Sequence, residues 1–474
     1  MADHGSTSAR ASRFRAVALC PFLVLLVGFH LDQSSSIGAE TITLEAENGI
    51  LDGTSVSSKV PGYSASGYVT GFRATNSLVR WEFKASAGPY RLIVRFRSPY
   101  GQKNFVGVVN GSSISGIFPR RNSFDIQDIG SFEMAAGTNT IQLGGGTGFY
   151  DIDSVELFPY PRPLAVPAKL SDPQATARTR ELMQRLANDY GKLTWSGQQE
   201  TGDLPYIQKI AQRSPLIIAG DFLEYCPTRV ERNKRPASYT EDLIALARSN
   251  HVLAFSWHWN APTNLLDSKD QPWWKAFYTS ATTFNVAAAL DDTNSAEYGL
   301  ILRDIDVIAG ELKKTAAADI PILWRPLHEA EFGGFWWGAK GPEAFKRLWR
   351  LLYSRLTGHH GLHNLIWVLS NEREDWYPGD DVVDIVGVDG YPKNQSDTLR
   401  PRWEALKSRL DGKKLIALTE FGGVPDIEKM HGYGVWWSWF LSWVGDQYGP
   451  PSSPTNVVVR TYQSPEVAPF SRAP

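Results

Sequence analysis

The feature that most constrains the fold is a regular alternation of short apolar runs and helical stretches after about residue 170. In the helical stretches, 177–190, 239–249, 298–317 and 345–356, apolar residues recur every three to four positions. Eight strand–helix units in about 300 residues predict a (β/α)8 TIM barrel. A doubly wound open sheet is the alternative, but the sequence has no Gly-rich phosphate loop of the Rossmann or Walker type. The expected strands are 193–196, 216–220, 252–257, 320–324, 365–369, 385–388, 415–418 and, weakly, 434–437.

The segment before this alternation has a different pattern. Residues 40–158 contain short runs in which apolar and polar residues alternate, separated by Gly- and Asn-rich turns. This spacing is typical of an all-β sandwich, here expected to be jelly-roll-like. A proline-dense stretch at 159–168 predicts a short semi-rigid linker. The chain is therefore expected to be multidomain, with the barrel over residues 169–474.

The first 39 residues have the pattern of a secretory signal peptide. Basic residues Arg10, Arg13 and Arg15 precede an apolar stretch, and small residues near Ala39 offer a cleavage point. The apolar stretch is shorter than the roughly 20 residues that a membrane helix needs, although a retained anchor is the alternative. We therefore expect a secreted, extracellular protein with no membrane association once the signal is removed.

The charge balance gives no reason to expect nucleic acid as a partner. The 474 residues include 48 basic and 50 acidic ones, for a net charge of −2. Only Cys226 remains after signal removal, so an internal disulfide is excluded. A monomer is expected.

Several polar residues follow directly on predicted barrel strands. The carboxyl ends of barrel strands are where enzymes with this fold build their active sites. Core packing would instead scatter polar residues along the helices. The residues in question are His258, Glu329, Asn371, Asp389, Tyr391 and Glu420.

Two glutamates among them suggest acid/base chemistry on sugars. Glu329 lies next to His328 and is soon followed by Phe335-Trp336-Trp337, while Glu420 is flanked by Phe421 and glycines. A carboxyl pair across a cleft can cleave a glycosidic bond, and aromatic rings stack on sugar faces. A single glutamate at a strand end is more often a salt-bridge partner or a helix cap. Two in such settings favour catalysis.

The neighbouring polar residues have both functional and structural interpretations. His258 and His328 could bind sugar hydroxyls or a catalytic carboxylate, or be buried, satisfied core histidines. The spacing of a zinc site is absent around them. Tyr391 could hydrogen-bond a nucleophilic carboxylate, and Asp389 could orient it or bind substrate. Asp389-Gly390 is also ordinary turn chemistry.

Tryptophan is concentrated in the second part of the chain. Of the 17 tryptophans, only Trp81 precedes residue 190. Adjacent residues on a strand face opposite ways, so part of each Trp pair must be core. The candidates for sugar stacking are Trp336, Trp337, Trp436 and Trp437.

Residues 190–445 resemble glycoside hydrolase family 26. The resemblance rests on Arg325–Glu329 with Phe335–Gly338, on 256–259 (SWHW), on 376–380 (WYPGD), on 384–391 (DIVGVDGY) and on 419–422 (TEFG). It implies a retaining endo-β-1,4-mannanase on a (β/α)8 barrel. By the resemblance, Glu329 is the acid/base and Glu420 the nucleophile, while His258, His328, Tyr391 and Trp436 line the site around the cleaved linkage. Together with Trp337 and Asp389, these four are the expected substrate-binding residues.

One position departs from the family pattern. Members commonly carry a Trp just before the Phe-Trp-Trp run, where this chain has Gly334. Mannan or galactomannan is the expected substrate, and mixed-linkage β-glucan and β-1,3-xylan are alternatives within the family. A barrel that binds polysaccharide without cleaving it is a further alternative. Catalysis is expected to need no cofactor.

Residues 40–158 resemble carbohydrate-binding module family 35. Leu44–Gly49, Ser66–Phe72, Val109–Gly111 and Phe149–Leu157 support this. The resemblance implies a structural calcium on Glu45, Glu47 and Asp153, because Ca2+ prefers oxygen ligands. Tyr63, Asn110 and Phe149 are weaker candidates for sugar contact.

Overall fold

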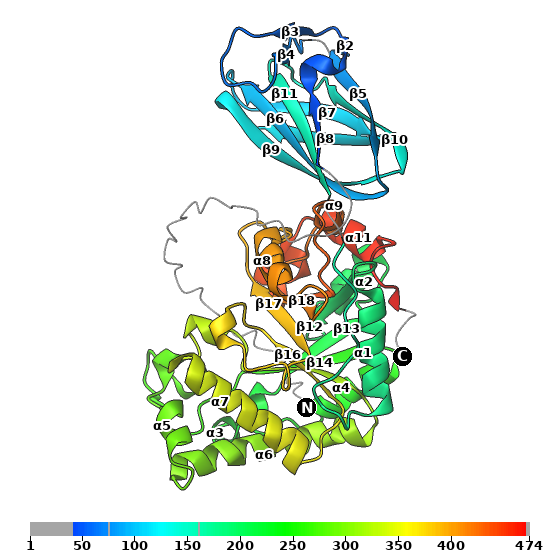
Figure 1. Ribbon diagram of the computed structural model, residues 1–474. Helices are drawn as coiled ribbons and strands as arrows, with labels where there is room; N and C mark the ends of the chain where they lie inside the picture. Colours follow the sequence, from blue (N-terminus) through cyan, green and yellow to red (C-terminus); the bar gives the residue numbers. More distant parts are fainter. Residues whose placement is uncertain (1–40, 74–75, 160–161, 471–474) are drawn as a thin grey trace, which may run out of the picture. The chain divides into compact units, whose positions relative to one another are not determined.

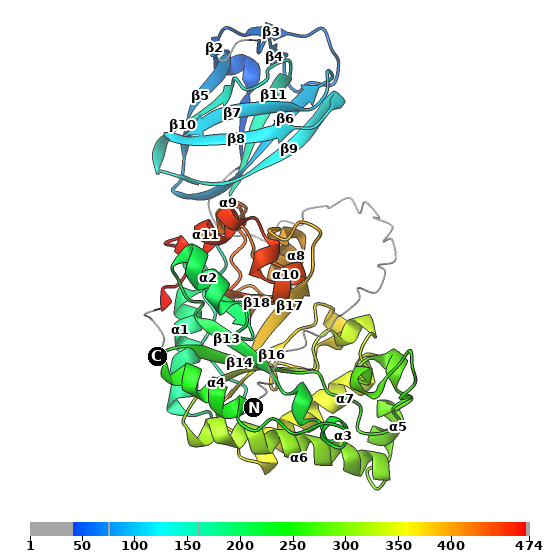
Figure 2. The same cartoon turned by 180° about the vertical axis from the view of Figure 1, so that it is seen from behind.

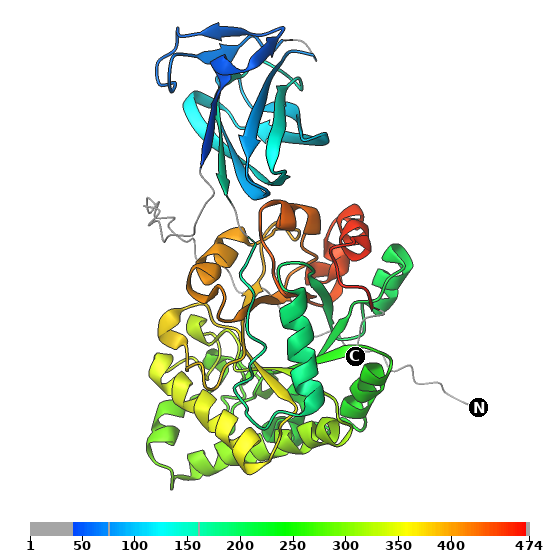
Figure 3. The ribbon, with the colours of Figure 1, turned by 45° about the vertical axis from the view of Figure 1, so that its right-hand side comes forward.

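The computed structural model describes residues 41–73, 76–159 and 162–470 of the chain, which form two regions with separate hydrophobic cores (Figure 1). The predicted signal peptide, residues 1–39, and two residues of the predicted linker lie outside the described residues. Figure 3 shows the first region in blue to cyan and the second in green to red.

The first region is a β-sandwich of two antiparallel sheets, as predicted. One sheet has the order β3-β4-β11-β6-β9, with β1 paired to β11, and the other has the order β2-β5-β10-β7-β8. The strands are β1 Ile42–Glu45, β2 Ile50–Asp52, β3 Ser55–Ser57, β4 Tyr68–Thr70, β5 Leu78–Ala85, β6 Gly88–Ser98, β7 Lys103–Val109, β8 Ser112–Phe118, β9 Arg121–Met134, β10 Gly137–Gly144 and β11 Asp151–Pro159.

Strand β5 illustrates why these segments form a sandwich. Val79, Trp81 and Phe83 are buried, while the residues between them are exposed. This period of two gives the strand one face for the core and one for solvent. The same alternation in the other sheet places two apolar faces together.

The second region is a closed barrel of eight parallel strands, which confirms the predicted fold. The barrel order follows the sequence, and β12 pairs with β19 to close it. All eight strands are almost wholly buried, as expected for strands covered by helices outside and side chains inside. They are β12 Trp195–Gln199, β13 Ile217–Asp221, β14 Val252–Trp257, β15 Ile322–Pro326, β16 Leu365–Leu369, β17 Ile385–Gly390, β18 Leu415–Phe421 and β19 Trp439–Ser442.

Helices cover the outside of the barrel, and Figures 1 and 2 show α4, α6 and α7 on its outer side. Helix α6 begins where the Ser295 hydroxyl accepts the backbone N–H of Tyr298. In α7 the buried residues, among them Phe345 and Trp349, form one apolar stripe. The helices are α1 Ala177–Asp189, α2 Leu204–Ala211, α3 Pro227–Val230, α4 Tyr239–Arg248, α5 Val286–Asp291, α6 Ala296–Ala317, α7 Gly341–Tyr353, α8 Arg400–Leu410, α9 Ile427–Gly432, α10 Gly445–Tyr448 and α11 Thr455–Gln463.

Short helical turns occupy several loops. The turn η6 is π-helical and continues α7. The turns are η1 Ala46–Asn48, η2 Leu223–Tyr225, η3 Trp273–Lys275, η4 Thr279–Ala281, η5 Ala330–Phe332, η6 Ser354–His359, η7 Glu374–Trp376 and η8 Pro450–Ser452.

The eighth strand lies further along the chain than predicted. The expected strand at 434–437 is instead a loop, and β19 begins at Trp439. Backbone pairing of Trp439 with Trp195 and of Phe440 with Leu418 fixes this register. The prediction was wrong because the apolar run Trp436-Trp437 has the composition of a strand. As a result, Trp436 precedes its strand, and Trp443 follows it.

Candidate active site

The carboxyl ends of neighbouring barrel strands bring most of the predicted site residues together. His258 follows β14, and Glu329 stands three residues beyond the end of β15. Asp389 lies within β17, and Glu420 within β18. Because all eight strands are parallel, these ends meet at one mouth of the barrel.

One buried arginine links two of the carboxylates. Arg325, on β15, donates from Nη1 to Asp389 Oδ2 at 2.6 Å and from Nη2 to Glu420 Oε2 at 2.5 Å. Thr419 donates to the other oxygen of Asp389 at 2.7 Å. The guanidinium is a permanent cation in a fixed fork, so it sets the orientation of both carboxylates.

Glu420 is held on both of its oxygens. Oε2 accepts from Arg325, and Oε1 accepts a hydrogen bond from the Tyr391 hydroxyl. Tyr391 itself is exposed at the mouth of the barrel. Two donors on one buried carboxylate leave its attacking lone pairs in a fixed direction, as a nucleophile requires.

Glu329 has the opposite electrostatic setting. Burial, followed by the charges of Glu420 and Asp389, raises the pKa of its carboxyl well above the ordinary value, and Arg325 only partly opposes this. Its carboxyl is therefore protonated under conditions where an ordinary glutamate is ionised. A carboxyl group kept protonated by its surroundings can serve as a general acid.

The backbone at Glu329 is unusual. Leu327 and Glu329 have φ values of 51° and 53°, a left-handed conformation that side chains with a Cβ rarely adopt. The N–H of Glu329 donates to the carbonyl of Ser370 at 3.1 Å, and the Leu327 side chain is buried. These contacts fix the backbone from which the Glu329 side chain extends.

A pair of histidines stands beside Glu329. The Nε2 atoms of His258 and His328 face each other at 3.1 Å. Asp221, at the end of β13, accepts from Nδ1 of His258 at 2.6 Å. Burial opposes the ionised form of Asp221, but the charge and hydrogen bonds of His258 and the Ser256 hydroxyl outweigh it and lower its pKa to about 2.

The surroundings of His328 oppose its protonation. Burial, followed by the positive charges of Arg325 and His258, lowers the pKa of His328 well below its ordinary value. Its Nδ1 atom is buried and has no hydrogen-bond partner among the described residues. Trp337 donates from its indole to the His328 carbonyl at 2.9 Å and is itself wholly buried. Trp337 thus supports His328 and has no face open to a sugar.

Two rings that sequence reasoning missed border this site. Tyr278 stacks on Phe335, with ring centroids 5.6 Å apart, and its pKa is raised by burial and then by the charges of Glu329 and Glu420. Trp443 lies with its ring centroid 6.4 Å from those of both His258 and Tyr391. Both rings are only partly buried, so they can offer a face to a sugar.

Arg325 and Asp221 were also missed. Arg325 stood inside the Arg-Pro-Leu-His-Glu motif, where a cation near two carboxylates could have been suspected. Asp221 had a weaker signal, as a polar residue at the end of a predicted strand.

The structure does not bring Trp436 to this group. Trp436 precedes β19, at the amino-terminal end of the barrel, and its ring stacks on His431 at 3.8 Å. It is 5% exposed. Trp436 is therefore a packing residue. The ring that lies at the mouth, directly after β19, is Trp443.

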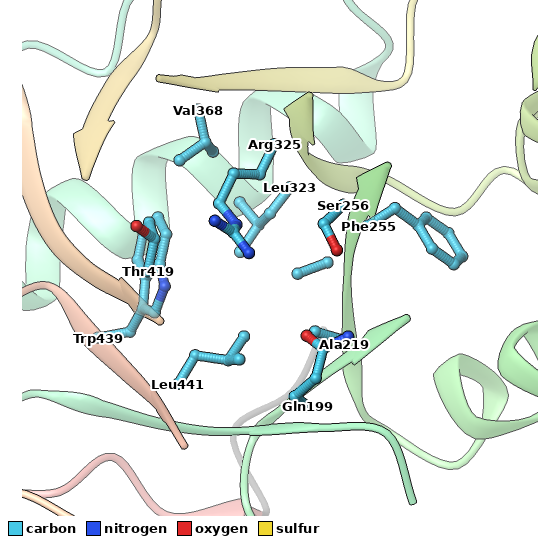
Figure 4. A pocket seen from close by; sticks show the side chains of 11 residues that line it. Gln199, Ala219, Phe255, Ser256, Leu323, Arg325, Val368, Thr419, Trp439 and Leu441 are labelled. Atoms are coloured by element: carbon cyan, nitrogen blue, oxygen red, sulfur yellow. The ribbon is translucent and has the colours of Figure 1, made fainter. Parts of the chain in front are cut away.

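A small cavity lies in the interior of the barrel (Figure 4). Its volume is about 10 Å³, so it is too small for a sugar ring. Arg325, Gln199 and Ser256 line it together with apolar side chains. The barrel interior is therefore a packed core, and a ligand as large as a sugar would have to lie across the mouth above it.

The three carboxylates predicted to hold calcium do not form a metal site. Glu45 and Asp153 both accept hydrogen bonds from Ser64, and Arg95 pairs with Asp153 at 2.8 Å. Glu47 instead accepts from Ser66 and Gly67. Protein donors contact one oxygen of Glu45, one of Glu47 and both of Asp153, while Glu47 Oε2 is buried without a partner among the described residues. The residues that the structure describes contain no group of three or more ligands that could hold a metal ion.

The three weaker candidates for sugar contact in the sandwich differ in their exposure and in the groups that they contact. The Asn110 amide is engaged with Asn139 and the backbone N–H of Thr140. Phe149 is 51% exposed, with Lys103 Nζ 5.6 Å from its ring centroid. Tyr63 packs near Tyr68, with centroids 6.0 Å apart. Of the two aromatic residues, Phe149 is the more exposed to solvent.

Comparison with known proteins identifies the family of each region. Residues 171–465 match glycosyl hydrolase family 26, and residues 42–160 match carbohydrate binding module (family 35). A mannan endo-1,4-beta-mannosidase of Thermothelomyces thermophilus is 41% identical over 86% of this chain and 84% of its own length. A mannan endo-1,4-beta-mannosidase A of Piromyces is 32% identical over 90% of this chain and 72% of its own length.

Solved structures give the same picture. The Podospora anserina GH26-CBM35 beta-(1,4)-mannanase superposes with a TM-score of 0.70 at 40% identity, covering 91% of this chain and 98% of that one. A ruminal GH26 endo-beta-1,4-mannanase superposes with a TM-score of 0.62 at 25% identity, covering 94% and 99%.

Proposed function

The chain belongs to glycosyl hydrolase family 26, and from this we propose that it is a retaining endo-glycosidase that cleaves β-1,4-mannosidic bonds in mannan or galactomannan. The observation that carries the proposal is the contrast between Glu420, held by Arg325 and Tyr391, and Glu329, whose pKa is raised well above its ordinary value. One carboxylate and one carboxylic acid at the same barrel mouth are what a double displacement needs.

In the first step Glu329 gives its proton to the glycosidic oxygen. An oxygen of Glu420 attacks the anomeric carbon, the glycosidic C–O bond breaks, and the leaving sugar departs as an alcohol. The product is an ester between the sugar and Glu420. Arg325 and Tyr391, which contact the Glu420 oxygens, orient that attack.

In the second step Glu329, now a carboxylate, takes a proton from water. The hydroxide attacks the anomeric carbon and the ester bond to Glu420 breaks, which restores both side chains. The two inversions give overall retention. Side chains and water supply all the groups in this scheme, so it uses no cofactor.

The other site residues receive supporting roles. His258, His328 and Asp389 would bind sugar hydroxyls or orient the two glutamates, and Trp443 and Tyr278 would stack on the sugars. The named activities of the Thermothelomyces and Piromyces relatives favour mannan over mixed-linkage β-glucan and β-1,3-xylan. Assay on a panel of these polysaccharides, with product sizes, tests both the substrate and the endo mode.

We also propose an organisation for the whole chain. Residues 1–39 would direct secretion and be removed, 40–158 would bind polysaccharide, 159–168 would link, and 169–474 would catalyse. Within the described residues, no helix is long and apolar enough to cross a membrane. Sequencing the amino terminus of the mature protein tests the signal.

Stereochemistry gives the direct test of the mechanism. Proton NMR during hydrolysis of a mannooligosaccharide is expected to show the β-anomer as the first product. Glu329→Gln and Glu420→Gln are each expected to lose about a thousandfold or more in kcat/KM while keeping the wild-type fold. Glu343→Gln, at an exposed glutamate on α7, is the matched control and should keep full activity. An α-anomer formed first would exclude the double displacement.

A further inference from the structure

A second, partly buried network runs across the mouth of the barrel, starting at Glu200. This residue directly follows β12 and has a φ of 58°, a strained conformation for a side chain with a Cβ. Its N–H donates to the carbonyl of Ala219 at 2.8 Å. Its carboxyl Oε1 accepts from the Tyr239 hydroxyl at 2.6 Å. The catalytic scheme above does not use Glu200.

Tyr239 connects Glu200 to the next strand. Tyr239 is the first residue of α4, and its hydroxyl oxygen accepts the backbone N–H of Asp221 at 2.9 Å. Gly220 leaves the space for this contact, since a Cβ there would lie 2.8 Å from the same hydroxyl. The phenol thus both donates and accepts, so its orientation is fixed at both ends.

Asp221 then reaches the histidine pair. Besides His258 Nδ1, its carboxylate accepts the backbone N–H groups of Leu223 at 2.7 Å and His258 at 3.1 Å. His258 in turn faces His328, the neighbour of Glu329. The chain of contacts is therefore Glu200, Tyr239, Asp221, His258 and His328, supplied by the ends of four successive strands and by α4.

Through the histidine pair, this series of contacts can affect Glu329. An acceptor-only carboxylate on Nδ1 of His258 requires a hydrogen there. The two facing Nε2 atoms must then share a single hydrogen, because one has to donate and the other to accept. A shift of Asp221 would change which imidazole holds it, and so the field at Glu329.

Glu200 is also a titrating group in this network. Burial, opposed by the Tyr239 hydrogen bond and increased by the charge of Asp221, raises the pKa of Glu200 to about 7. Tyr239 from α4 and Asp221 from β13 are the titratable groups that face it.

We propose that Glu200 and Tyr239 are positioning residues for the hydrolysis, which hold Asp221 so that His258 and His328 keep one orientation and one shared proton beside Glu329. The inference rests on the proposed function. Neither residue is assigned to contact the sugar.

A double-mutant cycle in the full chain tests the proposal. Glu200→Ala and Tyr239→Phe are each expected to lower kcat/KM on soluble β-1,4-mannan by about tenfold, chiefly through kcat. In a His258→Ala background, Glu200→Ala should have no further effect on kcat/KM. Glu200→Gln keeps an acceptor for Tyr239 and should recover activity to within about threefold of wild type.

Asp384→Asn is the matched control. Asp384 is a buried carboxyl at the opposite, amino-terminal end of β17, where it accepts the backbone N–H groups of Trp367 and Ser171. Its replacement should lower the thermal midpoint without changing kcat/KM. Thermal unfolding of the conservative variants Glu200→Gln and Tyr239→Phe verifies that they fold.

Two results would overturn the proposal. One is wild-type kcat/KM in folded Glu200→Ala and Tyr239→Phe. The other is a full, additive loss from Glu200→Ala in the His258→Ala background, which would mean that Glu200 acts independently of the histidines. An inactive wild-type chain on mannan would instead refute the proposed function, so the two failures are distinguishable.

Discussion

At the scale of single residues, the same groups that prepare the site for catalysis oppose its stability. Glu329 is partly buried near two other carboxylates, with one arginine as the shared cation. Burying a charge without a partner of its own costs free energy. Active sites commonly contain such groups, at the expense of stability.

Replacement of Glu329 should therefore stabilise the protein at neutral pH. Because its pKa in the folded state is raised above the ordinary 4.5, stability is complete below that value and is lost as pH rises through the folded pKa. Glu329→Gln removes this loss, so its thermal midpoint at pH 7 should exceed that of wild type by roughly 2–4 °C.

Calorimetry at two pH values checks this expectation. Near pH 4 the carboxyl is mostly protonated in both states, and the difference between Glu329→Gln and wild type should become small. The exposed Glu343→Gln serves as the control and should match wild type throughout. A Glu329→Gln variant that is less stable than wild type at pH 7 would contradict the assignment of a strained, uncharged acid.

Single residues also show which parts of the site could be predicted from the sequence. Glu329 and Glu420 were predictable because each carries its own local signal, a strand followed by a motif. Asp221 and Arg325 gain their meaning only from partners 37, 64 and 95 positions away. No local pattern encodes such distances, because barrel closure creates them.

At the scale of elements, strand register decides which side chains reach the mouth. Most strands were predicted to within a few residues because a buried parallel strand is an uninterrupted apolar run. The eighth failed because Trp436-Trp437 is equally apolar, and only pairing with β12 and β18 selects the true strand. The true strand begins five residues later than the predicted one, so the tryptophan at the mouth is Trp443 and not Trp436.

The two tryptophans should accordingly behave differently. Trp443→Ala is expected to lower kcat/KM by about tenfold or more, because it removes a ring that faces His258 and Tyr391. Trp436→Ala should lower the thermal midpoint and leave kcat/KM close to wild type, because that ring packs on His431. Steady-state kinetics and thermal unfolding of both variants separate these effects. A loss of kcat/KM in Trp436→Ala with wild-type activity in Trp443→Ala would instead mean that Trp436 contacts the substrate.

At the scale of the whole molecule, the described part of the chain has two separate hydrophobic cores. The core of the sandwich includes Trp81, and the core of the barrel includes Trp349. The switch from alternating runs to strand–helix units revealed this division in the sequence, since each pattern implies its own way of burying apolar surface.

Separate cores predict separate unfolding events. Calorimetry of the full chain should show two transitions, one for each region. Trp81→Ala should lower only the transition of the sandwich, and the matched Trp349→Ala only that of the barrel, since each removes a buried ring from one core. A single transition that both variants lower equally would mean that the two regions unfold as one cooperative unit.

The charge of Glu420 acts on Glu329, and the proposed reaction switches that charge off halfway. While Glu420 is a carboxylate, it helps to raise the pKa of Glu329. Once Glu420 is esterified to the sugar, this contribution disappears and Arg325 is left with one carboxylate fewer to neutralise. Glu329 then gives up its proton more readily, at the very stage at which the reaction needs a base. The covalent state of Glu420 thus sets the protonation state of Glu329. Each half-reaction thereby leaves Glu329 in the form that the next half-reaction needs.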